Sequence, residues 1–119
     1  MILGYLFSPI AFILGIHSND VFTVASLLGK KMVMNEFIAY TDLSSMIKEG
    51  ARTISMRAEV ISTYALCGFA NFSSIAIQLG GISPLATSRR GDLAKTGLKA
   101  MIAGTLVSLL NAAIAGILI

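Results

Sequence analysis

Apolar residues dominate this chain, and short polar or charged segments divide them into four stretches. A helix that spans a bilayer needs about 20 residues, so the first stretch is too short to cross comfortably, whereas the last two are long enough. The second stretch is interrupted by polar residues. The pattern predicts an all-α membrane protein with an interfacial helix over 1–17, a re-entrant helical hairpin over 19–48, a broken transmembrane helix over 58–82 and a continuous transmembrane helix over 92–118.

The 58–82 stretch carries polar residues where a lipid-facing helix would carry leucines. Hydrocarbon penalises polar groups that lack partners, so this segment should face protein or a cavity. Its polar and small residues recur at intervals of three or four, which would place them on one helical face: Thr63, Cys67, Asn71, Ser74, Gln78 and Gly81. We interpret this face as the lining of a polar site.

The 19–48 stretch consists of two moderately apolar halves around Asn35-Glu36-Phe37, and neither half is a clean spanning helix. Together they are typical of a re-entrant hairpin, which exists only when it is packed inside protein. Glu36 would then lie at membrane depth, where a carboxylate costs roughly 2.5–3.5 kcal/mol and needs a partner or a purpose. An amphipathic surface helix with a solvated Glu36 explains the same pattern, and the pattern alone does not choose between them.

The last stretch has no charged residue from Ala100 to Ile119. At 1.5 Å a residue, this run is about 30 Å long, which is the thickness of the hydrocarbon layer. Small residues recur at every fourth position and form a stripe that lets another helix approach closely: Gly104, Ser108, Ala112 and Gly116. We expect this stripe to be a packing surface.

The composition agrees with a membrane protein and excludes several other classes. Of the 119 residues, 55% are hydrophobic and 13% are charged, whereas soluble domains carry about 25% charged residues. The net charge of +3 comes from short basic clusters between apolar stretches, which does not indicate a nucleic-acid partner. With a single histidine and no cluster of metal ligands in the sequence, we expect neither an enzyme nor a metal or cofactor site.

Four residues from the hairpin and the broken helix form a candidate binding site: Glu36, Phe69, Asn71 and Ser74. The carboxylate accepts hydrogen bonds, while the amide and the hydroxyl both donate and accept them. The phenyl ring can pack on a planar ring. These groups suit a small ligand with hydroxyls and a flat heterocycle, and broken helices and hairpins near the midplane are the usual sites of secondary transporters. Polar residues that only join helices would give the same pattern, and that alternative stays open here.

Three blocks of the sequence resemble the C-terminal part of the concentrative nucleoside transporters. The first is GFANFSSIAIQLGGI over 68–82, followed by RRGDLA over 89–94. The second is MNEFIAY over 34–40, which is similar to the tip of the family's second hairpin. The third is the closing run LKAMIAGTLVSLLNAAIAGILI, which resembles the family's last helix.

The resemblance implies a cation-coupled nucleoside symporter that assembles as a homotrimer from protomers with inverted repeats, each with a hairpin and a partly unwound helix. It also implies that Glu36, Asn71 and Ser74 hydrogen-bond the ribose and that Phe69 packs near the base. Because the family's chain is several times longer, we expect this chain to be truncated and marginally stable alone. The other half of the transporter would hold most base contacts and the coupling-ion site, so Na+ or H+ and purine or pyrimidine stay open.

The distribution of basic residues predicts the orientation in a plasma (bacterial inner) membrane. Four basic residues flank the loop over 83–91, which the positive-inside rule places in the cytoplasm: Arg89, Arg90, Lys95 and Lys99. The C-terminus is then outside. Lys48, Arg52 and Arg57 would also lie outside, so the margin is narrow, four basic residues against three.

Two other hypotheses remain: a small membrane protein that binds another helix through its small-residue stripe, and a non-functional transporter fragment.

Overall fold

The computed structural model describes residues 2–48 and 52–119, and these form helices joined by short connections, with no strand among them. The all-α prediction is therefore confirmed for the described residues. In chain order the elements are α1 (Ile2–Ile13), α2 (Ser18–Val33), α3 (Glu36–Ile47), α4 (Met56–Leu66), α5 (Phe72–Ile82), the 3-10 turn η1 (Thr87–Arg89) and α6 (Arg90–Ile117).

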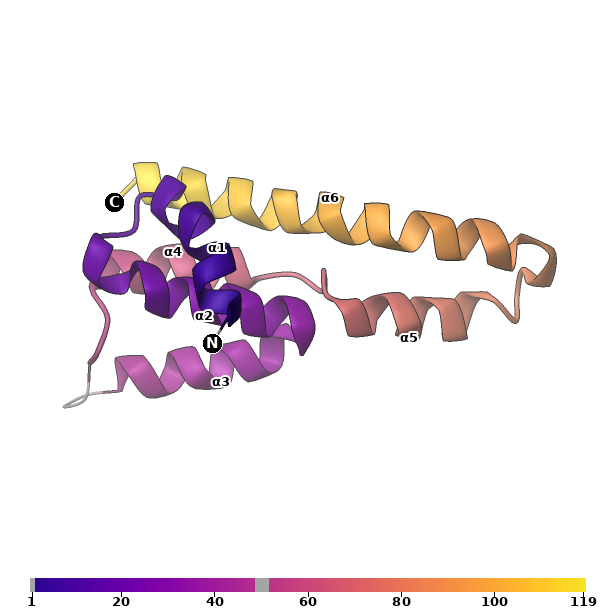
Figure 1. Ribbon diagram of the computed structural model, residues 1–119, viewed down its shortest axis with the longest axis horizontal. Coiled ribbons are helices and arrows are strands. Elements are labelled where there is room, and N and C mark those ends of the chain that lie inside the picture. Colours follow the sequence, from indigo (N-terminus) through magenta and orange to yellow (C-terminus); the bar gives the residue numbers. More distant parts are fainter. Residues whose placement is uncertain (1, 49–51) are drawn as a thin grey trace.

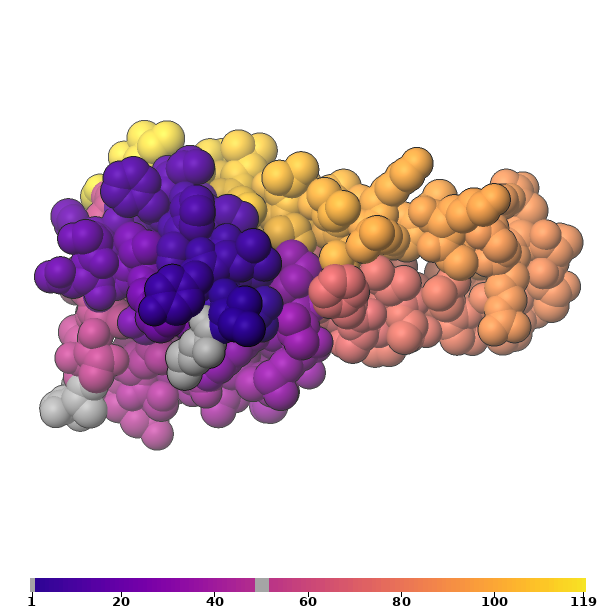
Figure 2. Space-filling model, in the orientation of Figure 1, coloured from indigo at the N-terminus to yellow at the C-terminus, as the bar shows by residue number. Residues whose placement is uncertain are grey.

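The protein is elongated, with principal extents of 53 × 26 × 25 Å. Helices α1 to α4 gather at one end, beside the C-terminal half of α6 (Figure 1). Helix α5 lies alone along the N-terminal half of α6, and together they form a narrow arm (Figure 2). The long helix α6 is thus the element that joins the two ends of the molecule.

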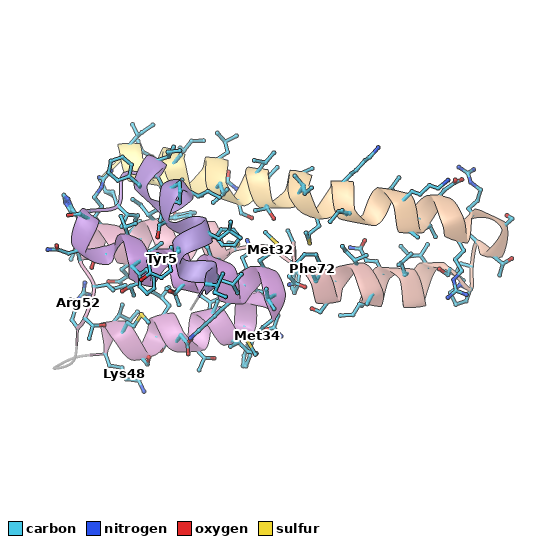
Figure 3. The ribbon with its side chains drawn as sticks, viewed as in Figure 1. Tyr5, Met32, Met34, Lys48, Arg52 and Phe72 are labelled. Carbon is cyan, nitrogen blue, oxygen red and sulfur yellow. The ribbon has the colours of Figure 1, made fainter. Side chains whose placement is uncertain are left out.

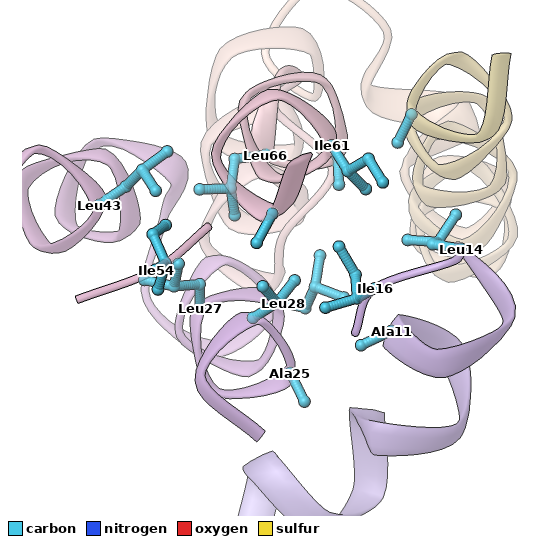
Figure 4. Close-up of a cluster of buried hydrophobic side chains, with 14 of the residues drawn as sticks. Ala11, Leu14, Ile16, Ala25, Leu27, Leu28, Leu43, Ile54, Ile61 and Leu66 are labelled. Atoms are coloured by element: carbon cyan, nitrogen blue, oxygen red, sulfur yellow. The ribbon is translucent and has the colours of Figure 1, made fainter. Parts of the chain in front are cut away.

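The buried core lies in the four-helix end, where α2 and α4 contribute the largest enclosed side chains (Figure 4). Leu27 of α2 and Ile61 and Leu66 of α4 expose 1% of their surface or less. In contrast, α5 has no buried residue. The arm therefore depends on α6 and on the polar connections at its base to hold its position.

Close contact between α1 and α2 depends on two glycines. A Cβ atom added at Gly29 would lie 2.6 Å from the Leu3 Cβ, and one added at Gly4 would lie 2.7 Å from the Ser26 Oγ. Real Cβ atoms do not approach other atoms so closely, and small residues at such positions let helix backbones meet. These glycines set the distance between the first two helices.

Polar bonds tie the connections together at the end of the molecule away from the arm. The Arg57 guanidinium donates to the carbonyl oxygens of Gly15 (2.9 Å) and Ile119 (3.0 Å). The buried Asp20 carboxylate accepts from the Ser55 hydroxyl (2.6 Å) and backbone N–H (3.2 Å). The turn before α2, the start of α4 and the end of the chain are therefore held as one unit.

Several predicted boundaries shift in the structure. The first helix ends at Ile13 instead of residue 17, because the chain turns at Gly15, whose φ is +80°. The last helix runs from Arg90 to Ile117, close to the predicted 92–118. The prediction of one continuous helical face from Thr63 to Gly81 is wrong, because the backbone leaves the helical conformation between α4 and α5.

Among the described residues, one helix is long and apolar enough to cross a membrane by itself. It comprises 31 residues, Thr87–Ile117, and its most apolar window has a mean hydropathy of 1.9. Helices α4 and α5 have 11 residues each, which gives each of them a length of about 16 Å. Each is therefore about half as long as a hydrocarbon layer is thick.

The close approach of α1 and α2 predicts opposite effects for two Gly-to-Ala substitutions within helices. Gly29→Ala should lower the free energy of unfolding by about 1–3 kcal/mol, because the new methyl group overlaps Leu3. Gly80→Ala is the matched control, since nothing lies within 4 Å of its Cβ position, and it should raise stability by up to about 1 kcal/mol. Thermal unfolding in detergent, followed by circular dichroism, measures both. Equal effects of the two substitutions would contradict this packing.

Candidate functional site

The candidate site is built around the interruption between α4 and α5. Helix α4 ends at Leu66, and the chain is non-helical from Cys67 to Asn71 before α5 begins at Phe72. Gly68 has a φ of +126°, which is strained for any residue with a side chain. A Cβ atom there would also lie 3.0 Å from the Ser108 hydroxyl. The interruption therefore follows from a glycine at a position where the backbone must turn.

At the C-terminal end of α4, side chains from three other helices satisfy carbonyl groups that lack intrahelical partners. Tyr40 of α3 donates to the Thr63 oxygen (2.7 Å), Lys31 of α2 donates to the Ala65 oxygen (2.9 Å), and Ser108 of α6 donates to the Cys67 oxygen (2.7 Å). Helix ends that are buried require such partners. The end of α4 is thus held from three sides.

At the N-terminal end of α5, Asn71 is the central group. Its side-chain oxygen accepts from the Ser74 N–H (2.8 Å), the Ser74 hydroxyl (2.9 Å) and the Ser73 hydroxyl (2.7 Å). This is the arrangement of an N-cap, in which a side chain satisfies the first free N–H groups of a helix. Its amide nitrogen donates to the Glu36 carboxylate (2.8 Å). Asn71 exposes only 1% of its surface, so the contact with Glu36 is enclosed.

Glu36 reaches Asn71 because the α2–α3 hairpin turns beside the interruption. Asn35 caps α3 by accepting from the Ile38 N–H (3.0 Å), and Glu36 follows as the first residue of that helix. The Ser73 hydroxyl also lies 3.3 Å from the Met34 carbonyl oxygen, and Figure 3 shows Met34 and Phe72 on the two sides of this junction. Two asparagine caps thus bring the starts of α3 and α5 together.

The hairpin offers opposite charges to the two ends of the interrupted helix. The C-terminal end of a helix carries a partial negative charge and the N-terminal end a partial positive charge. Lys31 brings an ammonium group to the end of α4, while Glu36 brings a carboxylate to the cap of α5. The sequence pattern did not indicate Lys31 or Tyr40 as parts of this site. The available signal was a lysine in a largely apolar stretch, Lys30-Lys31, which needs a partner wherever it is buried.

Phe69 and Ser74 lie beside a cleft of about 210 Å³ between α5 and α6. Asn71 and Gln78 also line this cleft, together with small residues of α6 that include Gly104. Phe69 is 78% exposed, so its ring packs little against the rest of this chain. Glu36 and Ser74 are half-buried, which leaves them within reach of a small molecule.

The small-residue stripe of α6 lies against the interrupted helix of the same chain. Ser108 and Ala112 are buried, and a Cβ atom at Gly116 would lie 3.1 Å from the Ile61 side chain. A Cβ atom at Gly104 would lie 3.1 Å from the Ala70 side chain. This face is therefore already occupied, and no feature of it favours the hypothesis of a separate helix-binding protein.

Comparisons with known proteins identify the relatives of this chain. It matches the family described as "Na+ dependent nucleoside transporter C-terminus" over residues 1–116. It is 53% identical over 118 residues to the uncharacterized transporter YutK of Bacillus subtilis, which covers 99% of this chain and 28% of that protein. It is 46% identical over 129 residues to sodium/nucleoside cotransporter 1 of Rattus norvegicus, which covers 99% of this chain and 20% of that protein.

The fold is similar to that of the transporter CNTnw, solved in an inward-facing substrate-bound state. The TM-score is 0.92 at 45% sequence identity, and the match covers 97% of this chain and 28% of that one. The chain thus spans 28% of the length of YutK and of CNTnw and 20% of the length of the rat cotransporter.

The contact between Glu36 and Asn71 can be tested by a double-mutant cycle. Asn71→Asp keeps the acceptor for the two serines but sets a second carboxylate against Glu36, so it should destabilise the protein by about 1–3 kcal/mol. Adding Glu36→Gln restores a donor facing an acceptor and should recover most of this loss. Melting temperatures of the four proteins in detergent give the coupling energy. Additive effects would show that the two side chains do not interact.

Proposed function

The chain belongs to the concentrative, Na+-dependent nucleoside transporters, of which it is the C-terminal portion, and from this premise we propose that it supplies the ribose-binding half of a nucleoside symporter. The family consists of integral membrane transporters. The observation that carries the proposal is the hydrogen-bonded cluster in which Asn71 joins Glu36 to Ser74 at the interruption between α4 and α5.

The chemistry of this cluster suits the hydroxyl groups of a sugar. The Glu36 Oε2 atom accepts from Asn71, whereas the second carboxylate oxygen accepts no hydrogen bond from the described residues. A carboxylate oxygen with free lone pairs binds hydroxyl donors strongly. The Ser74 hydroxyl is half-buried beside the cleft and can donate or accept. A ribose with neighbouring hydroxyls matches these groups.

Phe69 is the candidate contact for the nucleobase. Its ring is on the non-helical connection, two residues before Asn71, and is largely exposed beside the cleft. Aromatic rings prefer offset or edge contacts with other planar rings. Phe69 and Ser74 line the same cleft, so a base packed against Phe69 and a ribose at Ser74 fit one ligand. Phe69 therefore suits the base and the polar cluster suits the sugar.

The same arrangement supports a re-entrant hairpin and a broken transmembrane helix. We infer that α2 and α3 enter and leave the membrane on the same side, with their turn near the midplane. Helices α4 and α5 would cross the membrane in succession, since two helices of about 16 Å together match the hydrocarbon thickness. Helix α6 then returns across it. The loop over 83–91, with Arg89 and Arg90, would be cytoplasmic and the C-terminus outside.

The remaining parts of the transport cycle belong to the longer protein. We propose that the other half of the transporter holds the coupling-ion site and most base contacts, and that the complete protein assembles as a homotrimer. Na+ is the first candidate for the coupling ion, because the matched family and the rat relative are both named for sodium. A proton gradient is the alternative that an uptake experiment must compare.

Uptake of radiolabelled uridine tests the proposal. The chain is expressed in cells without their own nucleoside transporters, both alone and as a chimaera in which it replaces the matching C-terminal segment of CNTnw. We expect uptake by the chimaera and a loss of at least about 100-fold on Glu36→Ala or Asn71→Ala, because each removes a charge-assisted hydrogen bond worth about 3 kcal/mol. In the chimaera the coupling-ion site would come from CNTnw, so replacing Na+ with choline reports the coupling ion of that half.

The matched control is Ser45→Ala on the same hairpin, since the exposed Ser45 hydroxyl bonds only within its own helix. It should leave uptake unchanged. If the chimaera reaches the membrane and takes up uridine equally with and without Glu36, the ribose assignment is wrong. Uptake by the 119-residue chain alone would instead mean that these residues suffice for transport.

The exposure of Phe69 predicts a variant that separates binding from folding. Because its ring contacts little of this chain, Phe69→Ala should change the melting temperature by less than about 2 °C. The same substitution should raise the KM for uridine by about tenfold, through loss of packing on the base. Uptake kinetics and thermal unfolding on the same chimaera check both statements. A large loss of stability with an unchanged KM would assign Phe69 to the fold.

A further inference from the structure

Lys31 is a buried cation whose setting differs from that of the other lysines. Its side chain is on α2, and the residue exposes 3% of its surface. It takes part in none of the three ion pairs that the described residues form. The neighbouring Lys30, by contrast, is paired with Asp42 across the hairpin and is half-exposed. What Lys31 contacts is the Ala65 carbonyl oxygen, 2.9 Å away, in the last turn of α4.

An enclosed ammonium group costs several kcal/mol unless its surroundings compensate for the lost water. Here the compensation comes from the end of a helix. The last carbonyl groups of α4 carry the negative end of the helix dipole, and the favourable effect of a cation there is largest in partly buried geometry. The site therefore suits a cation that can donate a hydrogen bond to the Ala65 carbonyl oxygen.

In broken-helix transporters, the C-terminal ends of half-helices and the unwound carbonyl groups are places where coupling cations bind. We propose that Lys31 is a tethered cation that occupies such a position in this half of the protein and positions Glu36 and Asn71 for the ligand. An ammonium on a fixed side chain does not dissociate. The cation at this end of α4 is therefore held by a covalent tether, and no exchangeable ion is needed there.

The positioning role follows from the connections along the hairpin. Lys31 fixes α2 against the end of α4, and five residues later Glu36 contacts the cap of α5. Releasing the first contact allows the hairpin turn to move relative to both half-helices. This part of the inference rests on the proposed function, since it concerns ligand binding. The cation part does not, because it concerns only the charge at the end of α4.

Chemical rescue separates the charge from the packing. Lys31→Ala leaves space and no cation, whereas Lys31→Met fills the space with an uncharged chain of similar length. We expect both to lower the melting temperature in detergent by at least about 4 °C. Ethylammonium at about 100 mM should restore half or more of the loss in Lys31→Ala, by binding in the vacated position. It should not restore Lys31→Met or change the unsubstituted protein, and tetramethylammonium, which has no N–H donor, should do nothing.

The same variants in the CNTnw chimaera test the positioning role. Lys31→Ala should raise the KM for uridine at least about tenfold with Vmax changed less than about threefold, and ethylammonium should lower the KM again. A Lys31→Met protein as stable as the unsubstituted one, or equal effects of ethylammonium and tetramethylammonium on Lys31→Ala, would overturn the cation role. If Lys31→Ala gives no folded protein, the folded yield on gel filtration with and without ethylammonium replaces the melting temperature.

The two proposals fail in different ways. An unsubstituted chimaera that does not transport uridine would contradict the proposed function and leave the rescue of stability as the test of the cation. If ethylammonium restores stability but KM does not change, the cation role of Lys31 stands and its role in positioning Glu36 and Asn71 is overturned.

Discussion

An interrupted helix inside a membrane protein creates two sets of backbone groups that lipid cannot satisfy, and this structure is organised around their satisfaction. Between α4 and α5, carbonyl groups are released on one side and N–H groups on the other. The hairpin of α2 and α3 supplies both needs, with Lys31 and Tyr40 for the carbonyl groups and Glu36, through Asn71, for the N–H groups. Ser108 of α6 completes the set from the opposite side.

This constraint explains why the four-helix end is compact while the arm is not. Helix α4 is enclosed because three helices approach its end to bond its carbonyl groups, and apolar residues such as Ile61 and Leu66 fill the space that this leaves. Among the described residues, the side-chain hydrogen bonds of α5 lie at its start, and the helix buries none of its residues. Its exposed apolar residues include Phe72 and Ile77, and this chain matches the C-terminal part of a family whose members named above are several times longer.

The sequence predicts the helical class and the approximate elements, because apolar runs and their polar breaks have the lengths that bilayers impose. It also indicates Glu36, Asn71 and Ser74 as candidates, since polar residues in such runs need a reason to be there. The structure places them within one hydrogen-bonded cluster. Spacing could not reveal the partners at the end of α4, because Lys31 and Tyr40 bond to backbone atoms 34 and 23 residues away. Every residue has a backbone carbonyl group, so the pattern of side chains does not show which of them accepts a hydrogen bond.

The two ends of the interruption differ in how many hydrogen-bonding groups remain free. This difference argues against the alternative that all these polar residues only hold helices together. Polar residues that only hold helices together are expected to have their hydrogen bonds satisfied. At the end of α4, Lys31, Tyr40 and Ser108 each donate to a different carbonyl oxygen. At the start of α5 the balance is different. Glu36 uses one carboxylate oxygen for Asn71, and both Glu36 and Ser74 remain half-exposed. A binding site requires polar groups that are held in a fixed position and still have a hydrogen-bonding atom without a partner. Such groups are already oriented before the ligand binds. The end of α4 therefore provides rigidity, and the start of α5 retains hydrogen-bonding groups for the ligand that we propose.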